Sequence, residues 1–347
     1  MLGVSVYFKD MDLNYLKEAS KYNVKYVFTS LHIPEDNPDD IERKLPSLID
    51  MCNDLNIYLV SDISPFTFKN LKIANKDFKS LKGKGIKAIR LDYGIDDPEV
   101  VVKLQKDFKI FLNASVVDAD YLLKCKDKGL NLDDIVLMHN FYPHRDTGLE
   151  EVYFHDKNKE FLSLNLKIQA FVCGDDLMRY PLYEGLPTLE SHRGINPFVA
   201  AIELNKKFLI SEIFIGDSRA KIETIKFIND FLENNIINIK VNFESEYFEL
   251  YDRVFDLRGD YGSLIRLKKD RVCNVEIKHN TIRYKGSITM DNLLYGRYSG
   301  EISICKKELA SDSRVNVIGY IHPEYLDLLV YLNSEVKIRF IKSCNIS

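Results

Sequence analysis

Short apolar runs rich in β-branched residues alternate with longer amphipathic stretches along the first two thirds of the chain. Runs of the first kind predict buried strands, and apolar residues recurring every three or four positions predict helices. We expect eight strands, at residues 2–8, 25–30, 57–63, 86–92, 109–115, 134–140, 166–172 and 208–216. Eight strand–helix units in roughly 235 residues are typical of a (βα)8 barrel of the TIM type.

The helical segments are clearest at residues 39–55, 197–207 and 219–235. Asn196 followed by Pro197 marks the start of the second of these, because Asn accepts hydrogen bonds from first-turn amides and Pro suits the first helical position. A doubly wound open sheet is the alternative fold. Such a sheet more often has fewer strands and a glycine-rich first turn, and residues 6–12 contain no glycine.

Beyond residue 237 the pattern changes to closely spaced short strands and turns, with one clear helical stretch at 323–332. This texture predicts a small all-β barrel or sandwich. We therefore expect two domains, a catalytic TIM-like barrel at 1–237 and a β-barrel domain at 238–347. We find no internal repeat in either part.

The charge balance excludes several partners. Lys and Arg total 48 against 52 Asp and Glu, a net charge of −4, which gives no general attraction to nucleic acid or to an anionic membrane. The first ten residues do not read as a signal peptide, and no run is long enough to span a membrane. Six scattered cysteines without a disulfide or metal spacing fit a reducing cytoplasm. Nothing implies a cofactor, and the oligomeric state is not indicated.

Barrel enzymes carry their active sites at the C-terminal ends of the strands. These positions are unusually polar here, with side chains able to bind or move protons at Thr29, Ser30, His32, Glu35, Asp62, Asp92, Asn113, Ser115, His139, Asn140, Asp217 and Ser218. Asp217 and Ser218 are also expected to cap the helix that follows. Asp62 and Asp92 are each followed by several turn residues, so a capping role suits them less, and structural hydrogen bonding and catalysis are equally open for them.

Metal and phosphate-loop motifs are not convincing. The spacing of His32, His139, His144 and His192 matches no metal motif, so we expect hydrogen bonding rather than metal ligation. Cys173 reads as a small core residue, since no cation adjoins it in sequence. Gly83 and Gly85 lack the spacing of a phosphate loop and precede a strand, and we interpret them as a helix stop.

The stretch GLPTLESHRGINP at 185–197 crowds Glu190, His192 and Arg193 into four residues after the seventh strand. Barrels often bind phosphate in the loops after strands seven and eight. Because an arginine grips a phosphate or carboxylate with two parallel hydrogen bonds, Arg193 is the leading candidate for an anion clamp.

Several of these segments together resemble one family. The resemblance rests on LGVSVY, RLDYG, LNAS, MHNFYPHRDTGL, GLPTLESHR and IGDS, followed by GSITMDNLLYGRYSGEISI and RVNVIGYI, in this order along nearly the whole chain. In these the chain resembles the MupG family of 6-phospho-N-acetylmuramidases. The resemblance implies a TIM-like barrel joined to a cyclophilin-like β-barrel domain. It also implies a cytoplasmic enzyme of cell-wall recycling that cuts N-acetylmuramic acid 6-phosphate from N-acetylglucosamine in a phosphorylated disaccharide.

Glycoside cleavage usually needs one protonated and one ionised carboxyl group. We expect Glu190 and Asp92 to be this pair, with Asp62 next. The substrate's own acetamido group is an open alternative to an enzyme nucleophile. The anionic sugar needs local cations and hydrogen-bonding groups, for which the expected substrate-binding residues are His192, Arg193, Asn113, His139, Asn140, Arg145 and Asp217, with His144 as a further cation.

Three other functions remain as alternatives. A cyclophilin-like domain suggests prolyl isomerase activity, but a fold is poor evidence for function and residues 238–347 show no isomerase signature. A sugar-phosphate sensor would use the same pocket without turnover. An aldolase or lyase would need a Schiff-base lysine, and Lys25, Lys87, Lys109 and Lys167 lie near strand starts, away from the expected active face.

Overall fold

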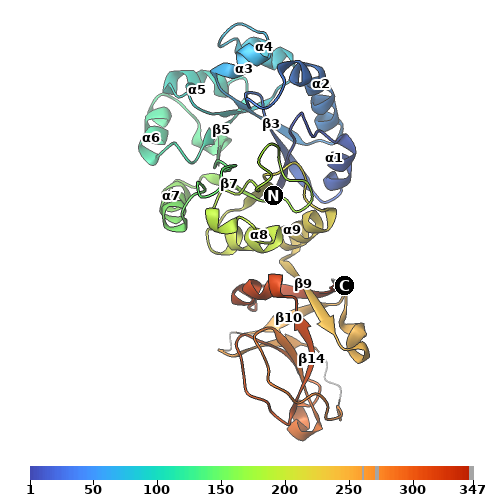
Figure 1. The fold of residues 1–347 in the computed structure, drawn as a ribbon. Coiled ribbons are helices and arrows are strands. Elements are labelled where there is room, and N and C mark those ends of the chain that lie inside the picture. Colours follow the sequence, from blue (N-terminus) through green and yellow to red (C-terminus); the bar gives the residue numbers. More distant parts are fainter. Residues whose placement is uncertain (260–261, 270–272, 344–347) are drawn as a thin grey trace. The chain divides into compact units, whose positions relative to one another are not determined.

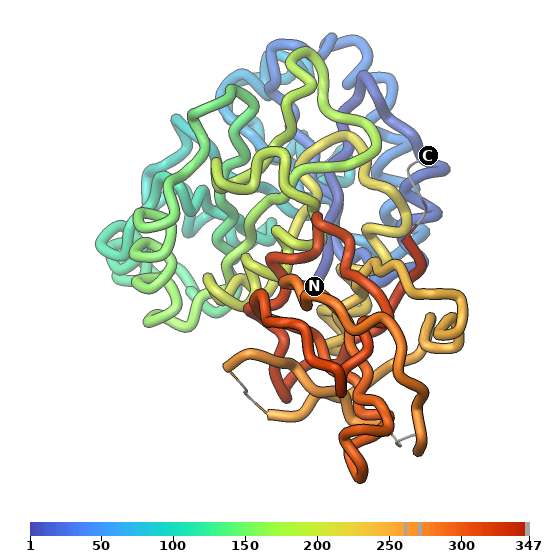
Figure 2. Tube along the Cα trace, turned by 60° about the horizontal axis from the view of Figure 1, so that its bottom comes forward, coloured from blue at the N-terminus to red at the C-terminus, as the bar shows by residue number. Residues whose placement is uncertain are grey.

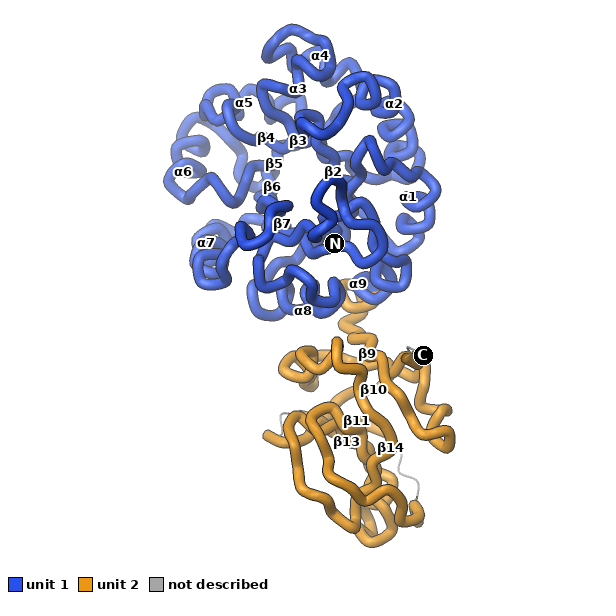
Figure 3. Tube along the Cα trace, in the orientation of Figure 1, with its two compact units in different colours: residues 1–229 blue, residues 230–347 orange. Residues whose placement is uncertain are grey.

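In the computed structural model, which describes residues 1–259, 262–269 and 273–343, the chain forms two compact units, Met1–Asn229 and Asp230–Ser347 (Figures 1 and 3). The division falls within helix α9 (Ile222–Asn234). The expected split after residue 237 lies just inside β9 (Ile236–Phe243), the first strand of the second unit. Among the described residues, no helix is both long and apolar enough to cross a bilayer.

The first unit is a closed barrel of eight parallel strands paired in sequence order, which confirms the predicted (βα)8 architecture. The strands are shorter than the apolar runs that predict them, because the last residues of each run turn into loops. They are β1 (Leu2–Ser5), β2 (Val24–Ser30), β3 (Tyr58–Ile63), β4 (Ala88–Leu91), β5 (Lys109–Asn113), β6 (Ile135–Met138), β7 (Lys167–Val172) and β8 (Glu212–Ile215).

Helices surround this barrel, as the ribbon shows (Figure 1). Three of them begin with an Asx-Pro pair, at Asn37, Asp97 and Asn196, where the Asx side chain accepts from a first-turn amide and proline takes the first helical position. The helices are α1 (Leu13–Ser20), α2 (Pro38–Asp54), α3 (Pro65–Asn70), α4 (Phe78–Gly83), α5 (Pro98–Gln105), α6 (Ala119–Asp127), α7 (Glu151–Ser163), α8 (Pro197–Lys206) and α9, with 3₁₀ turns η1 (Leu132–Asp134) and η2 (Glu190–His192).

Aromatic and aliphatic side chains from the strands fill the barrel, including Phe28, Phe111, Phe171 and Phe214. The packing leaves no room for a side chain on Gly3 of β1, where an added Cβ would lie 2.4 Å from the Phe214 ring. The interior is therefore a packed core, and the space for a ligand lies above it, at the strand ends.

The second unit is a closed seven-stranded barrel in the order β10-β11-β13-β12-β14-β9-β15. Its pairs are antiparallel except for β15 with β9, which are parallel. This confirms the predicted small β-barrel; the tube trace follows it in orange to red (Figure 2). The predicted helix at 323–332 is a 3₁₀ helix, η5 (Pro323–Tyr331). The other elements are β10 (Val254–Arg258), β11 (Leu264–Lys268), β12 (Ser287–Asp291), β13 (Ile302–Cys305), β14 (Val315–Ile321), β15 (Lys337–Lys342), η3 (Ser245–Leu250) and η4 (Leu293–Tyr298).

Candidate active site

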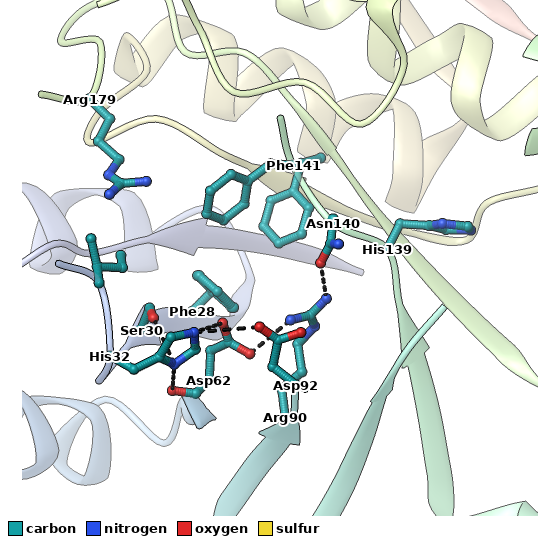
Figure 4. Close-up of a pocket in the computed structure, with 12 residues that line it drawn as sticks. Phe28, Ser30, His32, Asp62, Arg90, Asp92, His139, Asn140, Phe141 and Arg179 are labelled. Atoms are coloured by element: carbon teal, nitrogen blue, oxygen red, sulfur yellow. Dashed lines mark hydrogen bonds and ion pairs between the residues drawn. The ribbon is translucent and has the colours of Figure 1, made fainter. Parts of the chain in front are cut away.

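A cavity of about 170 Å³ lies at the C-terminal ends of the first barrel's strands (Figure 4). Its apolar wall includes Phe28, Phe141 and Phe171, whose rings pack edge to face at 5.2–5.7 Å. Its polar lining comes from Ser30, His32, Asp62, Arg90, Asp92, His139, Asn140 and Arg179. The polar residues that end β2, β3, β4 and β6 thus face one space, as their positions at the strand ends predict.

His32 lies between two carboxylates. Its Nε2 is 3.8 Å from Oδ2 of Asp62 and 3.5 Å from Oδ2 of Asp92. The barrel's pairing register brings them together, because Ser30 at the end of β2 pairs with Asp62 on β3 and Asp62 pairs with Arg90 on β4. At these distances the charges of the three side chains act strongly on one another.

Arg90 is a buried charge that the sequence interpretation overlooks. Its side chain is 3% exposed and donates to Oδ1 of Asp62 at 2.8 Å, to the Met138 carbonyl at 3.3 and 3.4 Å, and to Oδ1 of Asn140 at 2.5 Å. The sequence feature that could have revealed Arg90 is a single charged residue inside the apolar strand AIRL, because an arginine buried in a strand needs polar partners nearby. Arg90 fixes the orientation of Asp62 from within the wall.

The two carboxyl groups differ in acidity. Burial raises the pKa of Asp62, and the positive charges of Arg90 and His32 offset only part of this effect. Burial also acts on Asp92, but hydrogen bonding with His32, the charge of Arg90 and a hydrogen bond from Asn113 at 3.0 Å outweigh it and lower the pKa of Asp92. Opposite shifts in one cavity are the pattern by which enzymes separate a proton donor from an ionised carboxylate.

The shared histidine is biased toward its charged form. Burial alone would lower the pKa of His32, but a hydrogen bond with Asp92 and the negative charges of Asp62 and Asp92 raise it overall. A protonated His32 therefore stabilises negative charge on both aspartates.

Asn113 and Asn140 orient the charged groups. Asn113 donates to Asp92 and Asn140 accepts from Arg90, so both lie beside the charged groups, and their expected contact with the substrate stays a prediction. His139 borders the cavity, but its ring is fully buried between Ser115 at 3.2 Å and Asn158 at 2.7 Å and points away from the open space, which does not suit direct substrate binding (Figure 4). Burial lowers the pKa of His139 to about 3.

Glu190 and Arg193 form an ion pair with each other. Arg193 donates Nε and Nη2 to the two Glu190 oxygens at 2.6 and 2.7 Å, and its remaining donors bind the carbonyls of Tyr142, His144, Glu184 and Gly185. The expected roles do not fit this geometry, because Arg193 has no donor left for an anion. The hydrogen bonds from Arg193 and from two backbone amides lower the pKa of Glu190 to about 2, which favours an ionised support of the loop over a proton donor.

The other residues expected to bind the substrate lie in different surroundings. His192 is 1% exposed, and its Nε2 is 3.4 Å from Oε2 of Glu203, so it does not face a ligand. Arg145 is exposed and lies 3.5 Å from Glu184. The stretch 185–197 therefore has a structural role: its polar side chains bond to one another, to the backbone of residues 142–148 and to Glu203.

Asp217 and Ser218 do not cap α9, which corrects the sequence interpretation. Asp217 is buried and accepts from the amides of Gly174, Arg179 and Leu186 at 2.8–3.1 Å, while the hydroxyl of Ser218 bonds to Asp10. Asp175 takes the capping position instead, accepting from the Lys221 amide and the Thr224 hydroxyl. Asp217 thus organises the loop after β7.

His32, Asp62 and Asp92 form the one described group able to offer three metal ligands, with ligand atoms within 4.8 Å of one another. The donor set does not suit a cation, because the Arg90 guanidinium already neutralises Asp62 at 2.8 Å. The cluster fits proton transfer better than metal binding.

Comparison with known proteins decides the family. The N-terminal domain of 6-phospho-N-acetylmuramidases matches residues 2–230, and the C-terminal domain of the same enzymes matches residues 236–341. The chain belongs to the MupG family of 6-phospho-N-acetylmuramidases. This confirms the resemblance seen in the motifs, and it makes the chain a member of an enzyme family.

Two solved structures are similar to this family member over nearly its whole length. A conserved protein of unknown function from Enterococcus faecalis is 28% identical, with a TM-score of 0.86 over 99% of this chain and 96% of that one. An uncharacterized B. cereus protein is 25% identical, with a TM-score of 0.77 over 98% and 99%. No protein of curated function matches the sequence significantly. Both domains of this family member are therefore seen together in its structural relatives.

Proposed function

We propose that this 6-phospho-N-acetylmuramidase family member hydrolyses the bond between N-acetylmuramic acid 6-phosphate and N-acetylglucosamine in a phosphorylated disaccharide during peptidoglycan recycling. Family membership supports the phosphorylated muramic sugar. The observation that carries the chemistry is the pair Asp62 and Asp92, whose pKa values shift in opposite directions within one cavity.

In this proposal Asp92 is the ionised carboxylate that stabilises or attacks the anomeric carbon, because the hydrogen bonds from His32 and Asn113 favour its charged form. Asp62 is paired with Arg90 in the free protein and, because burial raises its pKa, takes up the proton that it passes to the leaving oxygen of the bound substrate. His32 lies between the two carboxyl groups. Asp62 thus takes the role of proton donor that the sequence interpretation gave to Glu190. The aromatic wall offers faces on which the apolar side of a sugar ring packs.

The site of action in this proposal is the cytoplasm, where a phosphorylated sugar is retained. The five cysteines in the described part of the chain are all free, which supports a reducing compartment.

The test is turnover of the phosphorylated disaccharide by the variants Asp92→Asn and Asp62→Asn. Each is expected to lose about 10²–10⁴-fold in kcat, the range for a lost acid–base or charged group, while still binding product. Asp50→Asn, an exposed position on α2, serves as the charge-matched control. Wild-type protein that binds the disaccharide without releasing N-acetylglucosamine is a sensor, and the proposal then fails.

A further inference from the structure

Arg179 lies in the loop after β7, and its guanidinium stands at the cavity opposite the Asp62–Asp92 pair (Figure 4). The group stacks 4.7 Å from the centroid of the Tyr7 ring and 5.9 Å from that of Phe141. Its side chain is 9% exposed. Stacking of this kind fixes the plane of a guanidinium and leaves its N–H groups directed outward at the edges.

The guanidinium has almost no polar partner. Within the described parts of the chain, its sole hydrogen-bond or ion-pair partner is Oε2 of Glu35, 3.4 Å from Nη2, while Asp36 and Asp217 act on it only through their charges. Arg90 and Arg193, by contrast, spend their donors on several protein oxygens. Because an arginine carries five N–H donors, Arg179 is the arginine with unused donors among the described residues that line this cavity.

The backbone under Arg179 is held rigidly. Its amide donates to Oδ1 of Asp217 at 2.9 Å, and the other oxygen of that carboxylate accepts from Gly174 and Leu186. The hydroxyl of Tyr7 donates to the Gly216 carbonyl at 2.6 Å, which fixes the ring beneath the guanidinium. Such an arrangement lowers the entropic cost of binding a ligand at this point.

We propose that Arg179 binds a negatively charged substituent of the substrate sugar, and that Glu35 holds the guanidinium in the free protein. The substituent is a phosphate monoester or a carboxylate, either of which accepts two parallel N–H bonds. This assignment rests on the proposed function for the identity of the sugar. It makes Arg179, in place of Arg193, the specificity-determining cation.

The experiment measures binding by calorimetry, so it does not depend on turnover. The probes are N-acetylmuramic acid 6-phosphate, N-acetylglucosamine 6-phosphate and N-acetylmuramic acid. Arg179→Met keeps the stacking volume and removes the donors, and Arg179→Lys keeps the charge. Arg43→Met, an exposed arginine on α2, is the control for net charge.

Arg179→Met is expected to bind the doubly substituted sugar 10- to 100-fold more weakly, Arg179→Lys to recover part of this, and Arg43→Met to match wild type. A loss confined to the two phosphorylated probes assigns the phosphate, and a loss confined to the two muramic probes assigns the carboxylate. Glu35→Gln is expected to tighten binding up to about fivefold, since it removes an ion pair that competes with the ligand.

Unchanged binding in Arg179→Met overturns the proposal, and so does an equal loss for all three probes that Arg179→Lys does not relieve. Failure of the proposed hydrolysis can be told apart from failure of the anion site. If Arg179-dependent binding is found and wild type still releases no N-acetylglucosamine, the anion site stands and hydrolysis does not.

Discussion

Asp62 and Arg90 form a buried ion pair at the edge of the barrel, with side chains 9% and 3% exposed and 2.8 Å between Oδ1 and Nη1. The other carboxylate oxygen, Oδ2, faces His32. One carboxylate oxygen of Asp62 is therefore held by the strand residue Arg90, while the other faces the cavity.

Replacing Arg90 with Met leaves the Asp62 carboxylate buried without its cation. The expected loss in free energy of unfolding is about 3–5 kcal/mol, measured by denaturant titration. Adding Asp62→Asn to Arg90→Met should recover part of the loss, because the second change removes the stranded charge. The exposed pair Arg43–Asp40 is the control, and Arg43→Met should leave the free energy of unfolding nearly unchanged. A similar small cost for Arg90→Met would show that the buried pair is not supporting the strand ends.

Hydrolysis is expected to retain the anomeric configuration. The nearest carboxylate oxygens of Asp62 and Asp92 lie within 4.8 Å of each other, which matches the spacing in retaining enzymes more closely than the spacing in inverting ones. Inverting enzymes separate the two groups by about 6.5–9.5 Å, whereas retaining enzymes place them about 5–5.5 Å apart. Proton NMR of the first-formed muramic product reads the outcome, and inversion would exclude Asp62 and Asp92 as the catalytic pair. Attack by the substrate's acetamido group would also retain configuration.

His32 is expected to set the acidic limb of the activity profile. Removing it as His32→Gln takes away a hydrogen bond and a positive charge that both lower the pKa of Asp92. The pKa of Asp92 should then rise, so kcat/KM should begin to fall at a higher pH than in wild type. A pH profile of kcat/KM from pH 3 to 8 measures this, and an unshifted acidic limb would rule out Asp92 as the group that must be ionised.

Buried His139 should make stability depend on pH. Its pKa of about 3 lies below the ordinary value of 6.5, so the unfolded chain binds a proton that the folded protein excludes. Its contribution to stability is full above pH 6.5 and declines as the pH falls toward 3, by up to about 1.4 kcal/mol per pH unit. His139→Gln should have a shallower slope of unfolding free energy between pH 6.5 and 4. The exposed His155→Gln is the control and should keep the wild-type slope.

Glu190→Gln separates the two interpretations of that residue. If Glu190 supports the loop, the variant should lose about 1–3 kcal/mol of stability through its weakened bonds to Arg193, Asp146 and Gly148, yet keep most of its kcat. Because the pKa of Glu190 is depressed to about 2, this contribution is present above pH 4.5 and is lost as the pH falls toward 2. A fully stable variant without turnover would restore Glu190 as a catalytic group.

The sequence alone determined the barrel, its eight strands in order and the β-rich second domain. Alternating strand and helix patterns are local, and Asx-Pro pairs such as Asn196–Pro197 mark helix starts without help from distant residues. The sequence was also sufficient to predict Asp62 and Asp92 as site residues, since polar residues at the ends of neighbouring parallel strands must meet at one edge of a barrel.

Only the tertiary structure decided how the charges pair. Glu190 and Arg193 stand three residues apart and form a closed ion pair, whereas Asp62 meets Arg90 and His32 across neighbouring strands, and Glu35 meets Arg179 from a loop far along the chain. The number of partners and the degree of burial set whether a carboxylate is a proton donor or a support. The number of partners and the degree of burial both depend on which loops cover the strand ends. Hydrogen bonds and desolvation act between residues that are distant in the sequence, so they leave no periodic pattern in it.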